Sequence, residues 1–246
     1  MRLEGRTALV TGGGSGFGAG IARAFRAEGA EVMLADVNAE AVEAMAGVLG
    51  AHWTVADVSE NASVACMAAA ALGALGHLDI LVNNAGVTHL PAPLEDIDEA
   101  EFDRVLHVNA KSVYLTARHL IPAMKARGRG VVLNIASTAA LSPRPRLSWY
   151  NASKGWMVTA TKAMAVELAP FGLRVNALCP VAGETPLLKS FLGEDTPETR
   201  ARFLATIPMG RFSTPQDLGH AAVFLCSDEA AFLTGAALEV DGGRCI

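Results

Sequence analysis

The chain has 246 residues, of which 51% are hydrophobic and 18% are charged, and its formal net charge is −5. Such a mildly acidic chain lacks the clustered basic face that nucleic-acid binding requires. No apolar run approaches the roughly 18 residues of a membrane-spanning helix, and the apolar run in residues 1–10 is too short for a secretory signal. The four cysteines lie far apart with no C-x-x-C pair, which indicates free thiols and no metal site. We therefore expect a cytoplasmic protein that binds neither nucleic acid nor a membrane.

Apolar runs of strand length recur along the whole chain. They are continuous, not alternating, as is typical of strands buried on both faces of a parallel sheet. The runs cover residues 7–12, 31–36, 53–58, 78–86, 130–137, 173–180 and 237–243. Helix-length segments lie between them, at 17–29, 38–50, 63–76, about 99–127, about 148–169 and 213–227.

Strands and helices that alternate through short links predict right-handed crossovers and a doubly wound sheet. We expect an α/β protein with a single Rossmann-type parallel sheet of about seven strands and helices on both faces. No linker divides the chain, so residues 1–246 are predicted to form one domain with its sites at the carboxyl ends of the strands. Only residues 182–211 do not have the pattern of core; they are polar and interrupted by Pro and Gly, which predicts a lid over the cleft.

A glycine-rich segment, TGGGSGFGAG, joins the first predicted strand to the first predicted helix. Glycine lets the backbone turn tightly and approach a pyrophosphate, whose charge the helix N-terminus stabilises. Two spacings fit. Gly14, Gly16 and Ala19 match G-x-G-x-x-A, whereas Gly12, Gly16 and Gly18 match G-x-x-x-G-x-G. A flexible turn is the alternative, but the position between strand and helix favours a dinucleotide site.

Asp36 ends the second predicted strand, eighteen residues after Gly18. A carboxylate there can accept hydrogen bonds from a ribose 2′-hydroxyl and would repel a 2′-phosphate. No Lys or Arg occupies positions 13–15 or 37–39, where a phosphate partner would stand, so NAD is favoured over NADP. The alternative is that Asp36 only caps the following helix.

Two further strand ends carry polar residues. Asp57 either accepts a hydrogen bond from an adenine amino group or caps the helix that starts near Ser59. The sequence NNAG (83–86) offers amides beside the same cleft, although Asn83 could equally tie adjacent strands together.

Tyr150 and Lys154 lie four residues apart in the segment LSWYNASKG, so they share one face of a helix. This could be a simple surface pair. It could also be a phenol held beside an ammonium group, which would let the phenol exchange a proton near neutral pH.

The motifs TGGGSGFG and NNAG, a serine at the end of the fifth strand, and YNASK together resemble the classical short-chain dehydrogenase/reductase family. The resemblance covers essentially the whole chain, down to LEVDGG. It implies that Tyr150 is the general acid/base, that Lys154 lowers the pKa of Tyr150 and binds the nicotinamide ribose, and that Ser137 hydrogen-bonds the substrate oxygen. Asn109 would help to hold the lysine. The implied cofactor contacts are Gly12, Ser15, Gly16, Phe17, Gly18, Asp36, Asp57, Val58, Asn84, Ala85, Gly86, Tyr150, Lys154, Pro180 and Thr185.

The chain departs from the family pattern after the sixth strand, where Val181 follows Pro180 in place of the usual glycine. Thr185 keeps the family spacing, but the valine side chain could shift this loop or narrow the nicotinamide pocket. The substrate region carries Arg144, Arg146, Trp149 and His89, and the two arginines could clamp a carboxylate or phosphate. Alternatively, they are solvated or face another subunit.

The resemblance implies an NAD-dependent oxidoreductase that interconverts a secondary alcohol and its ketone, with a sugar, polyol or hydroxy acid as the small-molecule substrate. The alternative is a 3-oxoacyl-thioester (acyl carrier protein) reductase, against which Asp36 argues, because such enzymes typically prefer NADPH. A non-catalytic dinucleotide sensor is a third possibility. The family commonly forms homotetramers through the helices at about 99–127 and 148–169, and Met157, Met164 and Val166 of the second helix are available to a partner. The alternative is that these apolar faces all belong to the internal core.

Overall fold

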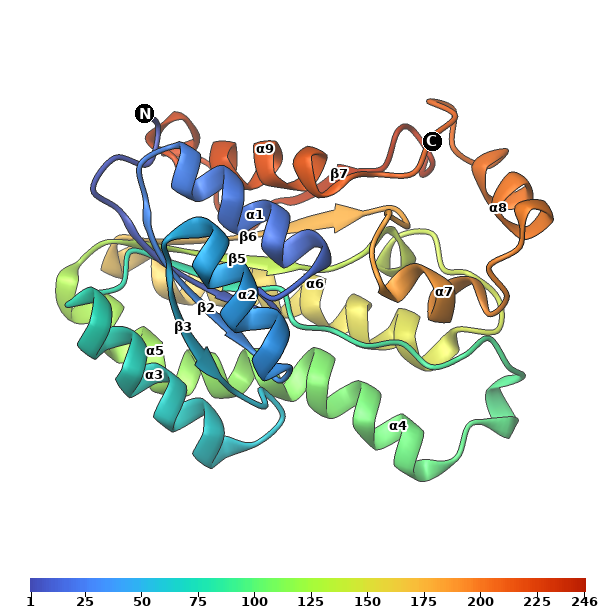
Figure 1. Cartoon of the computed structure of the whole chain (residues 1–246), viewed down its shortest axis with the longest axis horizontal. Helices are drawn as coiled ribbons and strands as arrows, with labels where there is room; N and C mark the ends of the chain where they lie inside the picture. The colour runs from blue at the N-terminus through green and yellow to red at the C-terminus, as the bar shows by residue number, and fades with distance from the viewer.

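The computed structural model describes residues 1–246, and its strands form one seven-stranded parallel sheet in the order β3-β2-β1-β4-β5-β6-β7 (Figure 1). The predicted doubly wound sheet is confirmed, and each predicted apolar run contains or overlaps one strand. The strands are β1 (Thr7–Thr11), β2 (Glu31–Asp36), β3 (His52–Val55), β4 (Ile80–Asn83), β5 (Gly130–Ile135), β6 (Leu173–Pro180) and β7 (Ala237–Val240).

Helices cover both faces of the sheet. One face packs against α1, α2 and α9, and the other packs against α3, α5 and α6 (Figure 1). No helix is both long enough and apolar enough to span a membrane. The helices are α1 (Gly16–Ala27), α2 (Ala39–Leu49), α3 (Asn61–Leu75), α4 (Glu99–Leu106), α5 (Ser112–Arg127), α6 (Ser148–Leu168), α7 (Leu187–Leu192), α8 (Pro197–Leu204) and α9 (Pro215–Cys226).

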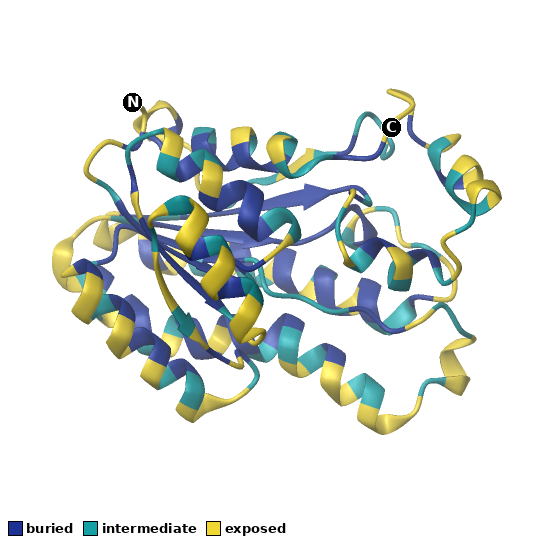
Figure 2. Ribbon diagram, in the orientation of Figure 1, coloured by how far each residue is buried: buried dark blue, intermediate teal, exposed yellow.

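The continuous apolar runs follow from burial of both faces of the sheet. Ala8 and Val10 of β1 belong to the apolar cluster beneath α1, α2 and α9, whereas Leu9 belongs to the cluster on the opposite face. Successive side chains of a strand point to opposite faces, so both sets must be apolar. Figure 2 shows the result: the central strands are buried and the outward faces of the helices are exposed.

The long helix predicted at about 99–127 is interrupted. A π-helical turn, His107–Lys111, separates α4 from α5, and the hydroxyl of Ser112, the first residue of α5, donates to the Val108 carbonyl at 2.6 Å. The turn contains Asn109, which is fully buried. π-helical turns are rare and often occur at functional sites. The pattern of residues 99–127 is that of one continuous helix, so it did not predict this turn.

Buried polar residues tie α5 and α6 to the middle of the sheet. The Asn83 amide donates to Asn134 Oδ1 at 2.9 Å, and the Asn134 amide donates to the Thr161 hydroxyl at 2.8 Å. The Thr116 hydroxyl donates to Asn83 Oδ1 at 2.9 Å. The structural interpretation of Asn83 is therefore confirmed: it joins neighbouring strands and does not face the cleft.

The strand order reverses between β1 and β4, where the chain leaves one half of the sheet for the other. A crevice forms at the carboxyl ends of strands at such a switch point. The segment that contains α7 and α8 lies beyond the ends of the strands, and the C-terminus of the chain lies beside α8 (Figure 1).

The surface of α6 differs from the expectation at two positions. Met157 is buried in the core, so it is not free to meet a partner helix, and Met164 is partly buried and packs against the core. Val166 is exposed as expected. Trp156 of α6 and Tyr114 of α5 are exposed as well. The periodicity of α6 could not separate these faces, because apolar residues occur all round the helix.

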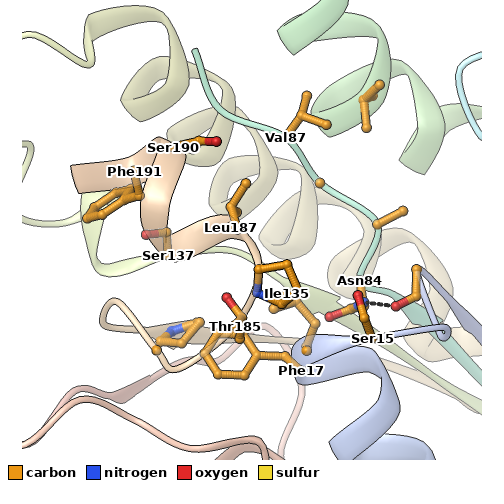
Figure 3. Close-up of a pocket in the computed structure, with 18 of the residues that line it drawn as sticks. Ser15, Phe17, Asn84, Val87, Ile135, Ser137, Thr185, Leu187, Ser190 and Phe191 are labelled. Carbon is orange, nitrogen blue, oxygen red and sulfur yellow. Dashed lines mark hydrogen bonds between the residues drawn. The ribbon is translucent and has the colours of Figure 1, made fainter. Parts of the chain in front are cut away.

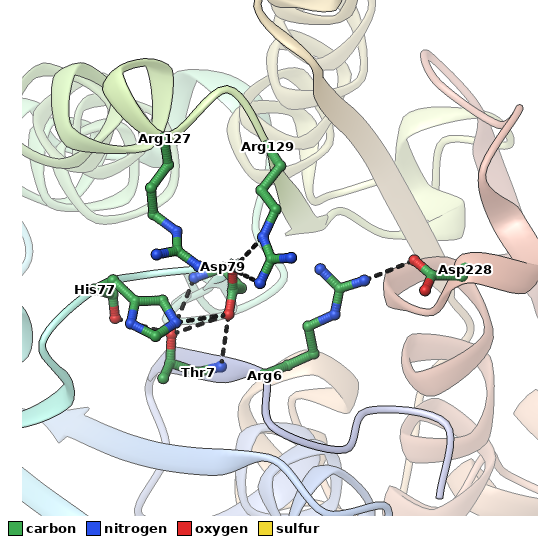
Figure 4. Close-up of polar contacts among 7 residues, drawn as sticks. All are labelled: Arg6, Thr7, His77, Asp79, Arg127, Arg129 and Asp228. Atoms are coloured by element: carbon green, nitrogen blue, oxygen red, sulfur yellow. Dashed lines mark hydrogen bonds and ion pairs between the residues drawn. The ribbon is translucent and has the colours of Figure 1, made fainter.

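Asp79 is a buried carboxylate at the amino-terminal end of β4 (Figure 4). It accepts from the Thr7 amide at 3.1 Å and from His77 Nε2 at 3.1 Å, and it pairs with Arg129 at 3.2 Å and Arg127 at 3.3 Å. Burial alone would raise the pKa of Asp79, but these donors and cations outweigh it and hold the pKa below its usual value. The cluster joins β1, β4 and the start of β5.

We predict that Asp79→Asn lowers the free energy of unfolding by about 2 kcal/mol at pH 7, because two arginines lose a buried partner. A carboxylate whose pKa is depressed on folding stabilises the protein above its unfolded pKa, and that contribution is lost as the pH falls through the folded value. Urea unfolding at pH 7 and at pH 4 should therefore show a smaller acid sensitivity in the variant.

The matched control is Asp228→Asn, which removes an ion pair between the exposed Asp228 and Arg6, 2.7 Å apart (Figure 4). It should change stability little, since solvent screens this pair. Equal destabilisation by the two variants would contradict the assignment of Asp79 as the stabilising carboxylate.

Candidate active site

A cavity of about 550 Å³ opens at the carboxyl ends of β1 and β4, at the switch point of the sheet. We call its two ends the aspartate end, lined by Asp36 and Asp57, and the tyrosine end, lined by Ser137, Tyr150 and Lys154. Figure 3 shows the walls of the cavity, with Ser15, Phe17 and Asn84 on one side and Leu187, Ser190 and Phe191 on another.

The glycine-rich loop lines the cavity between its two ends. Gly12 and Gly16 line it and have φ values of 62° and 54°, which favour glycine. A Cβ atom on Gly18 would lie 2.1 Å from the Gly12 carbonyl oxygen, so only glycine fits where α1 meets the loop. These positions favour the wider of the two predicted spacings. The amino terminus of α1 opens on the cavity and can stabilise a phosphate.

Asp36 does not cap the following helix, which was the alternative to a ribose contact. Asn38 caps α2, since its side chain accepts from the Ala41 amide at 3.0 Å. Asp36 instead accepts from the Gly14 amide and from the Asn38 amide, each at 3.0 Å. Its carboxylate is thereby fixed against the glycine-rich loop at the edge of the cavity.

Asp57 likewise does not cap α3. It accepts from the Ser59 amide at 2.9 Å and the Ser59 hydroxyl at 2.7 Å, and α3 begins later, at Asn61. Asp57 thus holds the turn after β3 and lines the aspartate end of the cavity.

Tyr150 and Lys154 lie on α6 and are both buried, with 5% and 4% of their surfaces exposed. The Lys154 ammonium donates to the Ile135 carbonyl at 2.8 Å. Burial lowers the pKa of Lys154 to about 8, and burial raises the pKa of Tyr150 although Ser137 opposes this. Desolvation of the phenol is thus the larger of these two effects, and the lowering of the Tyr150 pKa by Lys154 stays a prediction.

Ser137 follows β5, and its hydroxyl accepts from the Ala139 amide at 3.1 Å. This contact fixes the side chain at the tyrosine end of the cavity, beside Tyr150. Ser137, Tyr150 and Lys154 thus meet in one place although thirteen residues separate the serine from the tyrosine in the sequence.

Asn109 lies behind the cavity and does not line it. Its side chain accepts from the Val87 amide at 2.9 Å and donates to the Val87 carbonyl and the Ser153 hydroxyl, both at 2.9 Å. Asn109 fixes the segment after NNAG against α6. A Cβ on Gly86 would lie 3.3 Å from Lys154 Nζ and 3.4 Å from Asn109 Oδ1, so these groups surround one small space.

Of the remaining predicted cofactor residues, all but Gly18 line the cavity: Ser15, Phe17, Val58, Asn84, Ala85, Gly86, Pro180 and Thr185. Val181 also lines it, and its side chain is buried among Leu188, Phe203 and Phe212. The close approach that a glycine allows occurs two residues later, because a Cβ on Gly183 would lie 2.2 Å from the Phe17 ring. The catalytic and binding roles of these residues remain predictions.

The residues suggested for substrate recognition do not line this cavity. His89 is buried and contacts the Leu90 carbonyl at 2.8 Å, and Trp149 donates to the Leu94 carbonyl at 3.1 Å. Arg144 and Arg146 line a neighbouring pocket.

The sequence patterns did not indicate several residues that do line the cavity, namely Val87, Arg104, Val108, Leu187, Leu188, Ser190 and Phe191. Most of them come from the predicted lid or from α4 and the turn after it. Leu187 and Phe191 are apolar residues within the polar insertion at 182–211, and this contrast was the signal that could have predicted them as lining residues.

Comparison with known proteins agrees with this geometry. Residues 12–244 match the family model described as enoyl-(acyl carrier protein) reductase. The chain is 49% identical to the 4-formylbenzenesulfonate dehydrogenase TsaC1/TsaC2 of Comamonas testosteroni over all of both chains. It is 36% identical to the 2-dehydro-3-deoxy-L-rhamnonate dehydrogenase (NAD(+)) of a Sphingomonas species, over 99% of this chain and 96% of the other.

A solved structure titled 3-ketoacyl-(acyl-carrier-protein) reductase from Brucella melitensis complexed with NADH is 50% identical, with a TM-score of 0.95, and the match covers 99% of this chain and 100% of that one. The chain belongs to the short-chain dehydrogenase/reductase family. It is an NAD(P)-dependent oxidoreductase that acts on CH–OH groups.

We predict that Gly18→Ala weakens NADH binding at least about tenfold, because a new methyl group would collide with the Gly12 carbonyl and displace the loop. The control is Gly47→Ala in the middle of α2, where nothing lies within 4 Å of an added Cβ. It should leave NADH binding unchanged and raise stability by about 0.5–1 kcal/mol. Fluorescence titration with NADH measures the binding, and unchanged affinity in Gly18→Ala would contradict the assignment of the loop.

Proposed function

We propose that this protein is an NAD-dependent dehydrogenase that interconverts a secondary alcohol and its ketone. The proposal rests on the observation that two sets of residues line the same cavity. Ser137, Tyr150 and Lys154 line the tyrosine end, and Asp36 lines the aspartate end. The free chain already holds each set by its own hydrogen bonds.

In this proposal the residues of the chain handle the proton and the orientation of the substrate. Ser137 donates a hydrogen bond to the substrate oxygen, and Tyr150 takes the hydroxyl proton during oxidation or returns it during reduction. Lys154 stabilises the phenolate by its charge. A nicotinamide held beside Ser137, Tyr150 and Lys154 would supply the hydride acceptor for oxidation and the hydride donor for reduction.

The cavity residues fit NAD better than NADP. Gly12, Gly16 and the amino terminus of α1 leave a backbone cradle that a pyrophosphate can approach. The only cations that line the cavity are Lys154 and Arg104, and Arg104 is paired with Glu101 at 2.7 Å. No cation lines the aspartate end, so a 2′-phosphate would meet the Asp36 carboxylate without a partner.

The walls around the tyrosine end favour a substrate with an apolar body. Val87, Leu187, Leu188 and Phe191 supply them, and Ser190 and Arg104 add the few polar groups. Among sugar, polyol and hydroxy acid, this lining supports the hydroxy acid type. We further propose that α7 and α8 close over the substrate, and that the exposed Trp156 and Val166 of α6 take part in self-association as a tetramer.

A second candidate is a 3-oxoacyl-thioester reductase. The 3-ketoacyl-(acyl-carrier-protein) reductase from Brucella melitensis is 50% identical to this chain, which supports the candidate. Such a substrate ends in a bulky carrier. Reduction of an acetoacetyl thioester, measured with NADH and with NADPH, distinguishes this candidate from the NAD-dependent alcohol dehydrogenase.

We predict that Tyr150→Phe lowers kcat for alcohol oxidation by at least about 100-fold, because the proton acceptor is lost. NADH formation would be followed by absorbance with a panel of hydroxy acids, polyols and arylalkyl alcohols, and the acetoacetyl thioester would be tested in the reverse direction. Tyr114→Phe is the matched control, since Tyr114 is 53% exposed and does not line the cavity. Turnover that survives in Tyr150→Phe would contradict the proposed mechanism.

The proposed cofactor preference predicts a higher kcat/KM with NAD⁺ than with NADP⁺. Asp36→Asn keeps an acceptor for the Gly14 amide but removes the charge, so the ratio of the two kcat/KM values should shift towards NADP⁺ by about tenfold, equivalent to about 1.4 kcal/mol. Asp57→Asn is the control for a general loss of charge at this end. A wild-type preference for NADP⁺ would refute the assignment of Asp36.

A further inference from the structure

A second pocket of about 450 Å³ lies between α8 and the loop before α6, outside the cavity of the proposed active site. Four arginines line it: Arg144, Arg146, Arg202 and Arg244. They come from separate segments, namely the loop before α6, α8 and the end of the chain. The fold therefore brings together four cations that are scattered in the sequence.

The positive charge of this arginine pocket is compensated only in part. Its only acidic lining residue is Glu194, and none of the four arginines takes part in an ion pair. Other arginines in the same part of the chain are paired: Arg200 with Asp195, and Arg211 with Asp217. Guanidinium groups that line one pocket repel one another, and an external anion would offset this repulsion.

Two of these arginines lie partly buried against aromatic rings. Arg144 Cζ is 5.0 Å from the centre of the Phe191 ring and 5.3 Å from that of Phe203, and Arg244 Cζ is 5.3 Å from the Phe203 ring. Arg244 Nε is buried and has no hydrogen-bond partner. Desolvation, together with the charge of Arg244, lowers the pKa of Arg144. An oxyanion in the pocket would supply the missing negative charge.

The backbone at Arg146 supports a built site. Arg146 is the only residue other than glycine with a positive φ, at 66°. A non-glycine residue in this conformation is uncommon, and it holds the Arg146 side chain near the Pro91 carbonyl, 3.3 Å from Nη2, at the rim of the pocket.

The arginine pocket adjoins the tyrosine end of the active-site cavity through a single side chain. The Phe191 ring lies 5.9 Å from the Tyr150 ring on one side and carries Arg144 on the other. Figure 3 shows Phe191 beside Ser137 at that wall of the cavity. A group bound by the arginines would therefore lie one aromatic ring away from the phenol.

We propose that the arginine pocket binds an oxyanion, a carboxylate, sulfonate or phosphate, carried either by the far end of the alcohol substrate or by a free small anion. The binding site itself does not depend on the proposed function, whereas its use by a substrate does. Bidentate hydrogen bonds from Arg144, Arg202 and Arg244 would hold the anion. Glu194 limits the net charge of the site and disfavours polyanions that would contact it.

The test is calorimetric titration of the full-length protein with inorganic phosphate at constant ionic strength. Arg202→Gln and Arg244→Gln should each weaken phosphate binding at least about fivefold. Arg200→Gln is the matched control, because Arg200 also lies on α8 but is paired with Asp195 and does not line the pocket. If Arg244→Gln does not fold, the exposed Arg202 still tests the proposal. Phosphate that fails to bind the wild type, or binds all variants equally, would overturn it.

Steady-state kinetics distinguish the two sources of the anion. If the substrate carries it, phosphate will raise KM for an acidic alcohol without changing kcat, and Arg202→Gln will raise that KM but not the KM of an uncharged analogue. If a free anion binds, phosphate will not compete with the substrate. Phosphate binding that persists without any NAD⁺-dependent turnover would refute the proposed function and leave the anion site intact.

Discussion

The active site depends on one buried cation. Lys154 is 4% exposed, and the Ile135 carbonyl is the only protein group that accepts a hydrogen bond from its ammonium group, at 2.8 Å. An ammonium has three donors, so two remain for other groups. The nearby Gly86 leaves that space open, since even one added methyl would lie 3.3 Å from Nζ. Because burial disfavours the charged forms of both Lys154 and Tyr150, the site of the free chain holds its phenol in the neutral form.

Hydrogen bonds on two sides hold the buried pair of Tyr150 and Lys154 in place. On the sheet side, the hydrogen bonds from Asn83 through Asn134 to Thr161 connect β4 and β5 to α6. On the other side, the π-helical turn aims Asn109 at Ser153, one residue before Lys154. Fully satisfied polar contacts of this kind cost little and fix one geometry. The site of the proposed proton transfer and the proposed anion site share one wall residue, because Phe191 packs on both Tyr150 and Arg144.

The sequence predicted the sheet well because its signals are local. Runs such as TALVTG are apolar on both faces, and the glycines that follow are required by backbone geometry at Gly12 and Gly16. Signals that depend on contacts between distant segments were missed. The π-helical turn at His107–Lys111 and the wall residue Phe191 have no pattern of their own. The pKa of Tyr150 depends on burial, which cannot be predicted from its spacing to Lys154. Arg244 and Arg144 are a hundred residues apart in the sequence, and only the fold brings them close enough to interact.

The most direct test of the buried tyrosine–lysine pair is an ultraviolet pH titration of the phenolate. The chain has two tyrosines, and the Tyr114→Phe variant leaves Tyr150 as the only one. Burial predicts that Tyr150 in the free protein ionises at a higher pH than an ordinary tyrosine, whose pKa is about 10, and that NAD⁺ lowers this pKa by its positive charge. A Tyr150 that ionises below pH 9 without NAD⁺, or that does not respond to NAD⁺, would contradict a desolvated phenol poised for proton transfer.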